Sequence, residues 1–186
     1  ENLFSTLCAF VKALEIDPDH PYPYVLARAN IKFLQGDRSG ALVAFDKAIE
    51  LDPNNPYPYI IRGNIKVRLG LLNVALSDLA RATELDPKNP VPYVLKGQIR
   101  VEQGCWQAAL FEYSQAINLD PKNAISYFNR GSVKVKLRDL KGASADFTRA
   151  ITLNPDDPVF YHARGVILFY YEDLQGALSD FNRAAS

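Results

Sequence analysis

Cationic side chains recur along the chain at a fixed interval. One series places an arginine or a lysine every 34 residues, at Arg28, Arg62, Lys96, Arg130 and Arg164. A second series lies four residues further on, at Lys32, Lys66, Arg100 and Lys134. Rows of guanidinium and ammonium groups can bind phosphates, and on an exposed surface they would indicate nucleic-acid binding with a steep dependence on salt.

Most cations of the first series are followed, after a constant number of residues, by an acidic residue. This pattern favours ion pairing within the protein over phosphate binding. The matching acids are Asp78, Glu112, Asp146 and Asp180. If cation and acid lie on two adjacent helices, each repeat holds its own ion pair, and we therefore expect a structural role for these cations and no nucleic-acid binding. After Arg28 the corresponding residue is Ala44, so Arg28 needs another partner, for which Asp46 is a candidate.

Residue types that commonly perform catalysis are scarce. The chain has two histidines, His20 and His162, and two cysteines, Cys8 and Cys105, and no histidine adjoins a cysteine. Neither a metal-ligand spacing nor a phosphate-binding loop occurs in the sequence. We therefore predict a protein that is not an enzyme and that uses no metal and no cofactor. Trp106 is expected to pack against its own helix pair.

One repeated unit accounts for the whole sequence. A proline after Asp or Asn recurs at spacings of 35, 34, 34 and 34 residues, at Pro18, Pro53, Pro87, Pro121 and Pro155. With this proline numbered 32 in each unit, all ten glycines fall at positions 8, 15 or 19, and all twelve prolines fall at the junctions. A strict period of this length indicates stacked copies of one supersecondary unit.

Two helices are predicted in each unit. Asn55 followed by Pro56 supplies an N-cap and a first-turn proline, and the run from 56 to about 69 has helical spacing. Gly70 stands where that helix must end in a left-handed turn, and a second helix follows over about 73–86. No segment shows the alternation of a β-strand, so the predicted fold class is all-α.

Small and bulky residues alternate at fixed places so that the two helices can pack. Position 8 holds Ala29, Gly63, Gly97, Gly131 and Gly165, and alanine occupies positions 20 and 27. Position 24 holds Phe45, Leu79, Tyr113, Phe147 and Phe181. Position 4 holds Tyr59, Tyr93, Tyr127 and Tyr161. One helix pair cannot bury all of these side chains, so neighbouring units must stack to complete the core.

The period and these residues resemble the tetratricopeptide repeat. The resemblance covers the chain as a single array: residues 1–20 as the second helix of a partial repeat, full repeats over 21–55, 56–89, 90–123 and 124–157, and a truncated repeat over 158–186. It implies a right-handed α-solenoid, a superhelix of antiparallel helix pairs. It also implies a scaffold or adaptor that binds proteins.

Two departures from the pattern are visible. The first full repeat has one extra residue inside its first helix, which predicts a local bulge or an earlier helix start. In the fourth repeat Arg138 replaces the glycine of the inter-helix turn, so we expect that turn to be less tightly fixed.

Positions 2, 5, 9, 12 and 13 of each first helix share one face, which lines the concave groove in the family that the chain resembles. In the first two full repeats they are Tyr22, Val25, Asn30, Phe33 and Leu34, then Tyr57, Ile60, Asn64, Val67 and Arg68. In the third and fourth they are Val91, Val94, Gln98, Val101 and Glu102, then Ile125, Phe128, Ser132, Val135 and Lys136. In the last they are Val159, His162, Val166, Phe169 and Tyr170.

This face is unusually apolar, which is typical of a binding surface. We predict that it receives a peptide or an amphipathic helix of a protein partner, with Asn30, Asn64, Gln98 and Ser132 bonding the partner's backbone. The competing interpretation is that neighbouring repeats bury part of the face. A clamp for chaperone-tail carboxylates, known in similar arrays, is not expected, because position 5 holds Val, Ile, Phe or His in place of lysine.

The array as a whole could also serve in two further ways. It could regulate or target a larger enzyme, or it could associate with itself through open ends or through the groove. Charge is balanced at 21 basic and 21 acidic residues, and no apolar run is long enough for membrane insertion. Two cysteines are too few for a disulfide framework and favour a reducing compartment such as the cytoplasm.

Overall fold

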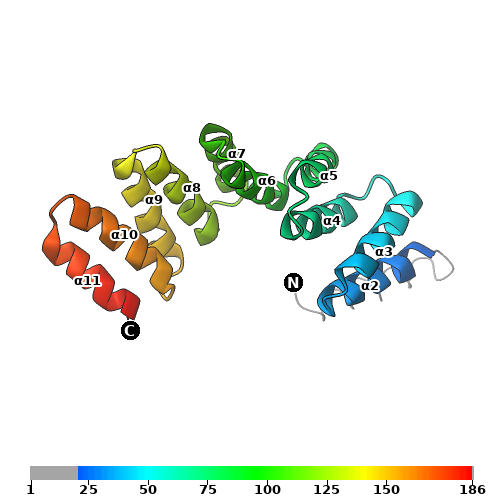
Figure 1. Cartoon of the computed structure of the whole chain (residues 1–186), viewed down its shortest axis with the longest axis horizontal. Helices are drawn as coiled ribbons and strands as arrows, with labels where there is room; N and C mark the ends of the chain where they lie inside the picture. The colour runs from blue at the N-terminus through cyan, green and yellow to red at the C-terminus, as the bar shows by residue number, and fades with distance from the viewer. Residues whose placement is uncertain (1–20, 186) are drawn as a thin grey trace. The chain divides into compact units, whose positions relative to one another are not determined.

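The computed structural model describes residues 21–185. Over this range the chain forms ten α-helices and no strand (Figure 1). The first helices of the repeats are α2 (Pro21–Leu34), α4 (Pro56–Arg68), α6 (Pro90–Glu102), α8 (Ala124–Lys136) and α10 (Pro158–Tyr170). The second helices are α3 (Arg38–Leu51), α5 (Leu72–Leu85), α7 (Trp106–Leu119), α9 (Leu140–Leu153) and α11 (Leu174–Ala185). The predicted partial repeat, with Cys8 and His20, lies outside the described residues.

Side-chain caps start α4, α6, α8 and α10, as predicted for Asn55. Asn55 and Asn89 accept hydrogen bonds at 3.0 Å from the backbone N–H groups two residues later, and Asp157 does the same. Asn123 caps α8 without a proline, through the N–H of Ser126. These oxygens satisfy donors that have no partner inside the helix, which fixes where each helix begins.

The turns inside the helix pairs adopt the left-handed conformation predicted for them. Gly36, Gly70 and Gly104 have φ values of 80°, 73° and 71°. Arg138 has a φ of 64° at the corresponding place, and Glu172 has one of 62° in the last repeat. The turn geometry is therefore the same in all five repeats, although two of them hold residues with a Cβ atom there.

The extra residue of the first full repeat lengthens its first helix. α2 has 14 residues and α4 has 13, and all residues of α2 are α-helical. Of the two predicted outcomes, the structure shows the earlier start relative to the turn glycine and no bulge.

Helices pack in consecutive pairs within two compact units. In the first unit, which ends at Lys88, α2 pairs with α3 and α4 with α5, and α3 packs on α4. In the second unit, from Asn89, the pairs are α6–α7, α8–α9 and α10–α11, with α7 on α8 and α9 on α10. Each second helix therefore contacts the next first helix of its unit, as the solenoid prediction requires.

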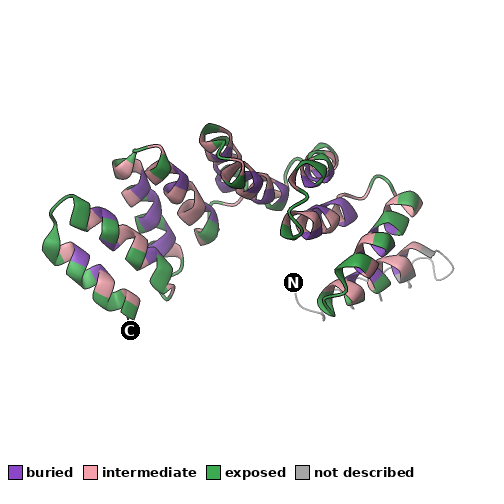
Figure 2. Ribbon diagram, in the orientation of Figure 1, coloured by how far each residue is buried: buried purple, intermediate pink, exposed green. Residues whose placement is uncertain are grey.

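The core of each pair lies where position 8 meets position 24. Figure 2 shows the buried residues on the facing sides of the helices. A Cβ atom on Gly131 would lie 2.7 Å from the ring of Phe147, and one on Gly97 would lie 2.7 Å from the ring of Tyr113. Glycine at position 8 therefore allows the approach that buries the large side chain at position 24.

No described helix is both long and apolar enough to cross a membrane.

Candidate functional site

The predicted ion pairs form in four consecutive repeats. Arg62 donates to Asp78 from Nε at 2.9 Å, and Arg130 and Arg164 donate in the same way to Asp146 and Asp180 at 2.9 and 2.8 Å. The contact is bidentate, since Nη2 of Arg130 also lies 2.7 Å from the second oxygen of Asp146. In the third repeat the pair is Lys96 with Glu112 at 3.2 Å. The structural interpretation of the first cation series is therefore confirmed.

The second cation series shares the same carboxylates in two repeats. Lys66 lies 2.8 Å from Asp78, and Lys134 lies 2.8 Å from Asp146. The aspartates are buried, so two cations compensate one desolvated carboxylate. The hydrogen bonds with Asp146 raise the pKa of Arg130 above its ordinary value.

The arginines also link consecutive repeats, a contact that sequence reasoning missed. Nη1 of Arg62 donates to Asp46 of the preceding repeat at 2.6 Å, and Nη1 of Arg164 donates to Thr148 at 3.3 Å. The prediction that Asp46 pairs with Arg28 is therefore wrong, because Asp46 pairs with Arg62. The available signal was a polar residue at position 25 in three of these repeats, namely Asp46, Ser114 and Thr148.

The tyrosines at position 4 cover the same guanidinium groups. The guanidinium carbon of Arg62 lies 5.7 Å from the ring centroid of Tyr59, and that of Arg130 lies 5.6 Å from Tyr127. The Tyr59 hydroxyl donates to the carbonyl of Pro53 at 3.2 Å, which ties the helix to the preceding junction.

On the first unit, much of the predicted binding face is internal. Asn30 and Ile60 are buried, and the hydroxyl of Tyr57 donates to Oδ1 of Asn30 at 2.7 Å. Phe33 and Tyr57 pack against the core around Phe45. Tyr22, Val25, Asn64 and Val67 are half-buried, while Leu34 and Arg68 are exposed.

On the second unit, the same face exposes more apolar surface. Phe128 packs between the rings of Phe147 and Phe160, at centroid distances of 5.6 and 5.2 Å. Val94, Val101 and Val135 also pack against core clusters. The exposed apolar members are Val91, Ile125, Val159, Val166, Phe169 and Tyr170. Glu102, Lys136 and His162 are exposed polar members.

Asn30, Asn64 and Ser132, three of the four polar side chains predicted to bind a partner's backbone, already have hydrogen bonds within the chain. Asn64 accepts from Nε of Arg68 at 3.5 Å, and the Ser132 hydroxyl donates to the carbonyl of Phe128 at 2.9 Å. Gln98 is half-buried. A partner's backbone would therefore have to share or replace these bonds.

Further exposed apolar residues adjoin the end of α10, and no sequence pattern singled them out. They are Tyr171, Leu174 and Leu178. The ring of Tyr170 packs edge-on against Tyr171 at 5.8 Å. In other repeats of this unit the counterparts of Leu174, which are Trp106 and Leu140, pack against a core cluster. The expected packing role of Trp106 is thereby confirmed.

Side chains suited to metal binding are not gathered anywhere in residues 21–185. Cys105 is an exposed free thiol. His162 lies against Phe181, with ring centroids 5.8 Å apart.

Comparisons with known proteins agree with this architecture. A family model described as TPR repeat matches residues 29–70 and 97–138, and one described as Tetratricopeptide repeat matches residues 124–157. A search of curated protein sequences gave no significant match.

Solved structures of the same fold include a crystal structure of MamA, which is 25% identical, has a TM-score of 0.77, and aligns over 84% of this chain and 92% of its own. YrrB is 24% identical, with a TM-score of 0.72 and coverage of 95% and 90%. PilF of Pseudomonas aeruginosa is 18% identical, with a TM-score of 0.81 and coverage of 90% and 76%.

The family models, the similar structures and the described helix pairs agree with one another. The chain belongs to the tetratricopeptide repeat family, an all-helical solenoid family of protein-interaction scaffolds.

Proposed function

We propose that the chain is an adaptor that binds a peptide or an amphipathic helix of a protein partner on the exposed face of the first helices in the second unit. The observation that carries the proposal is the run of exposed apolar side chains on α6, α8 and α10, which ends in Phe169 and Tyr170 at 62% and 67% exposure. Large apolar side chains in water on successive helices favour a protein-binding surface.

The two aromatic residues are the expected centre of the interaction. Large, rigid rings bury much area for little loss of conformational entropy, and they dominate the energetics of many interfaces. Tyr170 also keeps a hydroxyl that can bond a partner's backbone. Lys136 and Glu102 lie on the same predicted face and would supply charged groups at its border. A peptide ligand is supported by YrrB, whose structure is described as that of a TPR protein with an unusual peptide-binding site.

The test compares Phe169→Asp/Tyr170→Asp with Phe111→Asp. Phe111 is a suitable control because it is 60% exposed, in the same unit, but lies on the second helix α7. We expect the double variant to lose at least tenfold in the amount of partner captured at equal protein concentration, because two interface anchors together contribute more than about 1.4 kcal/mol. Capture by Phe111→Asp should equal that of the wild type.

Circular dichroism of both variants should match the wild type, because the replaced side chains are exposed. Equal losses in the two variants would contradict a site on α10. Light scattering tests self-association: if the wild type is a dimer and the double variant is a monomer, the partner of this face is a second copy of the chain. Phe128 and Ile60 are unsuitable for the test because their rings and methyl groups pack into the protein.

A further inference from the structure

The first full repeat differs from the repeats that follow at two sequence positions near its position-7 cation. Its cation is Arg28, and position 23, where the next repeats hold an acid, is Ala44. Three residues before Arg28 stands Val25, whereas Tyr59, Tyr93, Tyr127 and Tyr161 precede the later cations by the same distance. The repeat therefore has the arginine without an acid at position 23 and with a valine three residues before it.

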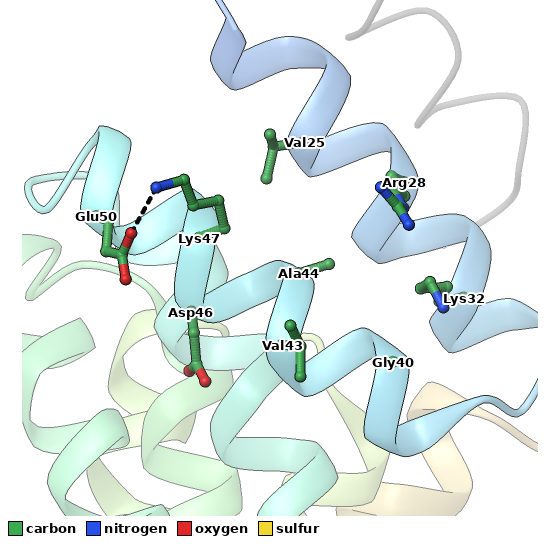
Figure 3. A pocket seen from close by; sticks show the side chains of 9 residues that line it. All are labelled: Val25, Arg28, Lys32, Gly40, Val43, Ala44, Asp46, Lys47 and Glu50. Carbon is green, nitrogen blue, oxygen red and sulfur yellow. Dashed lines mark hydrogen bonds and ion pairs between the residues drawn. The ribbon is translucent and has the colours of Figure 1, made fainter.

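A cavity of about 610 Å³ lies between α2 and α3 at this place. Figure 3 shows Val25 and Ala44 pointing into the space between the two helices. Arg28 and Lys32 line the cavity from α2, in the places that Arg62 and Lys66 take around Asp78 in the next repeat. The hollow therefore lies where the later repeats place the position-23 carboxylate.

The other charges of the cavity have partners within the chain. Asp46 binds Arg62 at 2.6 Å, and Lys47 binds Glu50 at 2.7 Å, as the dashed line in Figure 3 marks. Lys32 binds Asp37 at 2.7 Å on the exposed surface. Among the described residues none supplies a carboxylate to Arg28, whose side chain is exposed.

We propose that this cavity binds a carboxylate of a protein partner in the place of the missing position-23 aspartate. The guanidinium of Arg28 holds the carboxylate through its two-pronged fork, as Arg130 holds Asp146. Lys32 leaves Asp37 and makes a second contact with the bound carboxylate. Lys134 makes the corresponding contact with Asp146 in the fourth repeat. The space beside Val25 accepts an apolar or aromatic side chain next to the carboxylate. The carboxylate comes from a Glu or Asp side chain or from a chain terminus.

This site differs from the apolar face of the second unit. It lies in another unit and is built around positions 7, 11 and 23, with Val25 as the one member of the predicted binding face that also lines it. Loss of binding at one therefore does not imply loss at the other.

The probes are short peptides that differ only in their carboxylates. Acetyl-Tyr-Glu-Glu-Tyr-amide carries side-chain carboxylates, acetyl-Tyr-Gln-Gln-Tyr-amide carries none, and acetyl-Tyr-Gln-Gln-Tyr with a free C-terminus carries one terminal carboxylate. Each is titrated into the uniformly ¹⁵N-labelled chain, and the Nε–H resonance of Arg28 is followed by NMR. We expect saturable shifts with one or both acidic peptides and binding about tenfold weaker for the neutral peptide. Comparison of the two acidic peptides identifies the source of the carboxylate.

The decisive variant supplies the missing group from the chain itself. Ala44→Asp should pair with Arg28 and weaken binding of the acidic peptides about tenfold, whereas the isosteric Ala44→Asn should weaken it far less. If Ala44→Asp does not fold, Arg28→Gln serves instead, because it removes the guanidinium and should weaken binding of the acidic peptides in the same way. The proposal is overturned if the neutral peptide binds as well as the acidic ones, if none binds, or if Ala44→Asp and Arg28→Gln both bind like the wild type.

Discussion

At the scale of single residues, the recurring ion pair gives most of the cations of positions 7 and 11 carboxylate partners inside their own repeats. Each aspartate at position 23 is buried and receives two or three charge-assisted hydrogen bonds, for example Asp146 from Arg130 and Lys134. The pair fixes the first helix against the second, and Nη1 of the arginine reaches the preceding repeat. One side chain therefore holds three helices together.

Removing one of these carboxylates should be strongly destabilising. Asp146→Asn leaves Arg130 and Lys134 without a negative partner in a partly buried place, and we expect a loss of about 3 kcal/mol in the free energy of unfolding. Urea denaturation followed by circular dichroism measures it. Asp156→Asn is the control, since that side chain is 89% exposed and its nearest cation is 3.9 Å away. A loss below about 1 kcal/mol would show that the network contributes little.

The intra-repeat pairs could be predicted from the sequence, whereas the contacts between repeats could not. Arg62 and Asp78 recur at the same two positions in later repeats, so helical geometry alone brings them together. The second contact of Arg62 depends on the distance between neighbouring helix pairs, which no spacing within one repeat contains. The same limit applies to Asp46, whose partner is Arg62 of the next repeat and not Arg28 of its own.

At the scale of helices and turns, the chain forms the same turn with different residues. Gly104 and Arg138 both have left-handed backbone, with φ values of 71° and 64°. A residue with a Cβ atom is strained there, whereas glycine is not. The fourth repeat therefore retains a strain that the second and third repeats avoid. Glu172 repeats this feature, which the sequence pattern did not reveal.

Exchanging the turn residues should move stability in opposite directions. We expect Arg138→Gly to raise the free energy of unfolding by about 1 kcal/mol and Gly104→Ala to lower it by a similar amount. No atom lies within 4 Å of the Cβ that Gly104 would gain, so the loss reflects backbone conformation alone. Thermal melts of the two variants and the wild type provide the comparison. Destabilisation by Arg138→Gly would mean that the arginine side chain stabilises the turn more than its backbone strains it.

Helix starts and ends were also predictable, because caps, prolines and turn glycines act locally. The exposure of the first-helix face was not. Position 5 illustrates this, with Ile60, Val94, Phe128 and His162 in successive repeats. Ile60 is buried, whereas His162 is exposed. Burial there depends on which helices pack against the residue, and only the helix arrangement shows this.

At the scale of the whole molecule, the described chain comprises two compact units of helix pairs. Each unit has core clusters of its own: Phe45 with Ile65 in the first, and Phe147 with Ile167 in the second. In stacked repeats, stability comes from each repeat and from its contacts with neighbours. Damage to one core should therefore remain local.

A cavity in the first unit tests this expectation. Phe45→Ala removes a fully buried ring and should lower the local unfolding free energy of α2–α5 by about 3 to 5 kcal/mol. Hydrogen exchange read by mass spectrometry should show the loss of protection in these helices, with little change in α8–α11. Equal loss of protection in all helices would indicate that the chain unfolds as one cooperative body.

The extra residue of α2 lies before Arg28. The number of residues from Arg28 to the turn glycine Gly36 is therefore the same as from Arg62 to Gly70. The number of residues between position 7 and position 23 thus determines whether the cation and the acid face each other. An insertion inside it would rotate the remaining helix by about 100° and carry the carboxylate away from its arginine. An insertion ahead of it leaves every such distance unchanged. Repeat arrays built in this way can therefore gain or lose residues at the beginning of a first helix while their internal register is preserved.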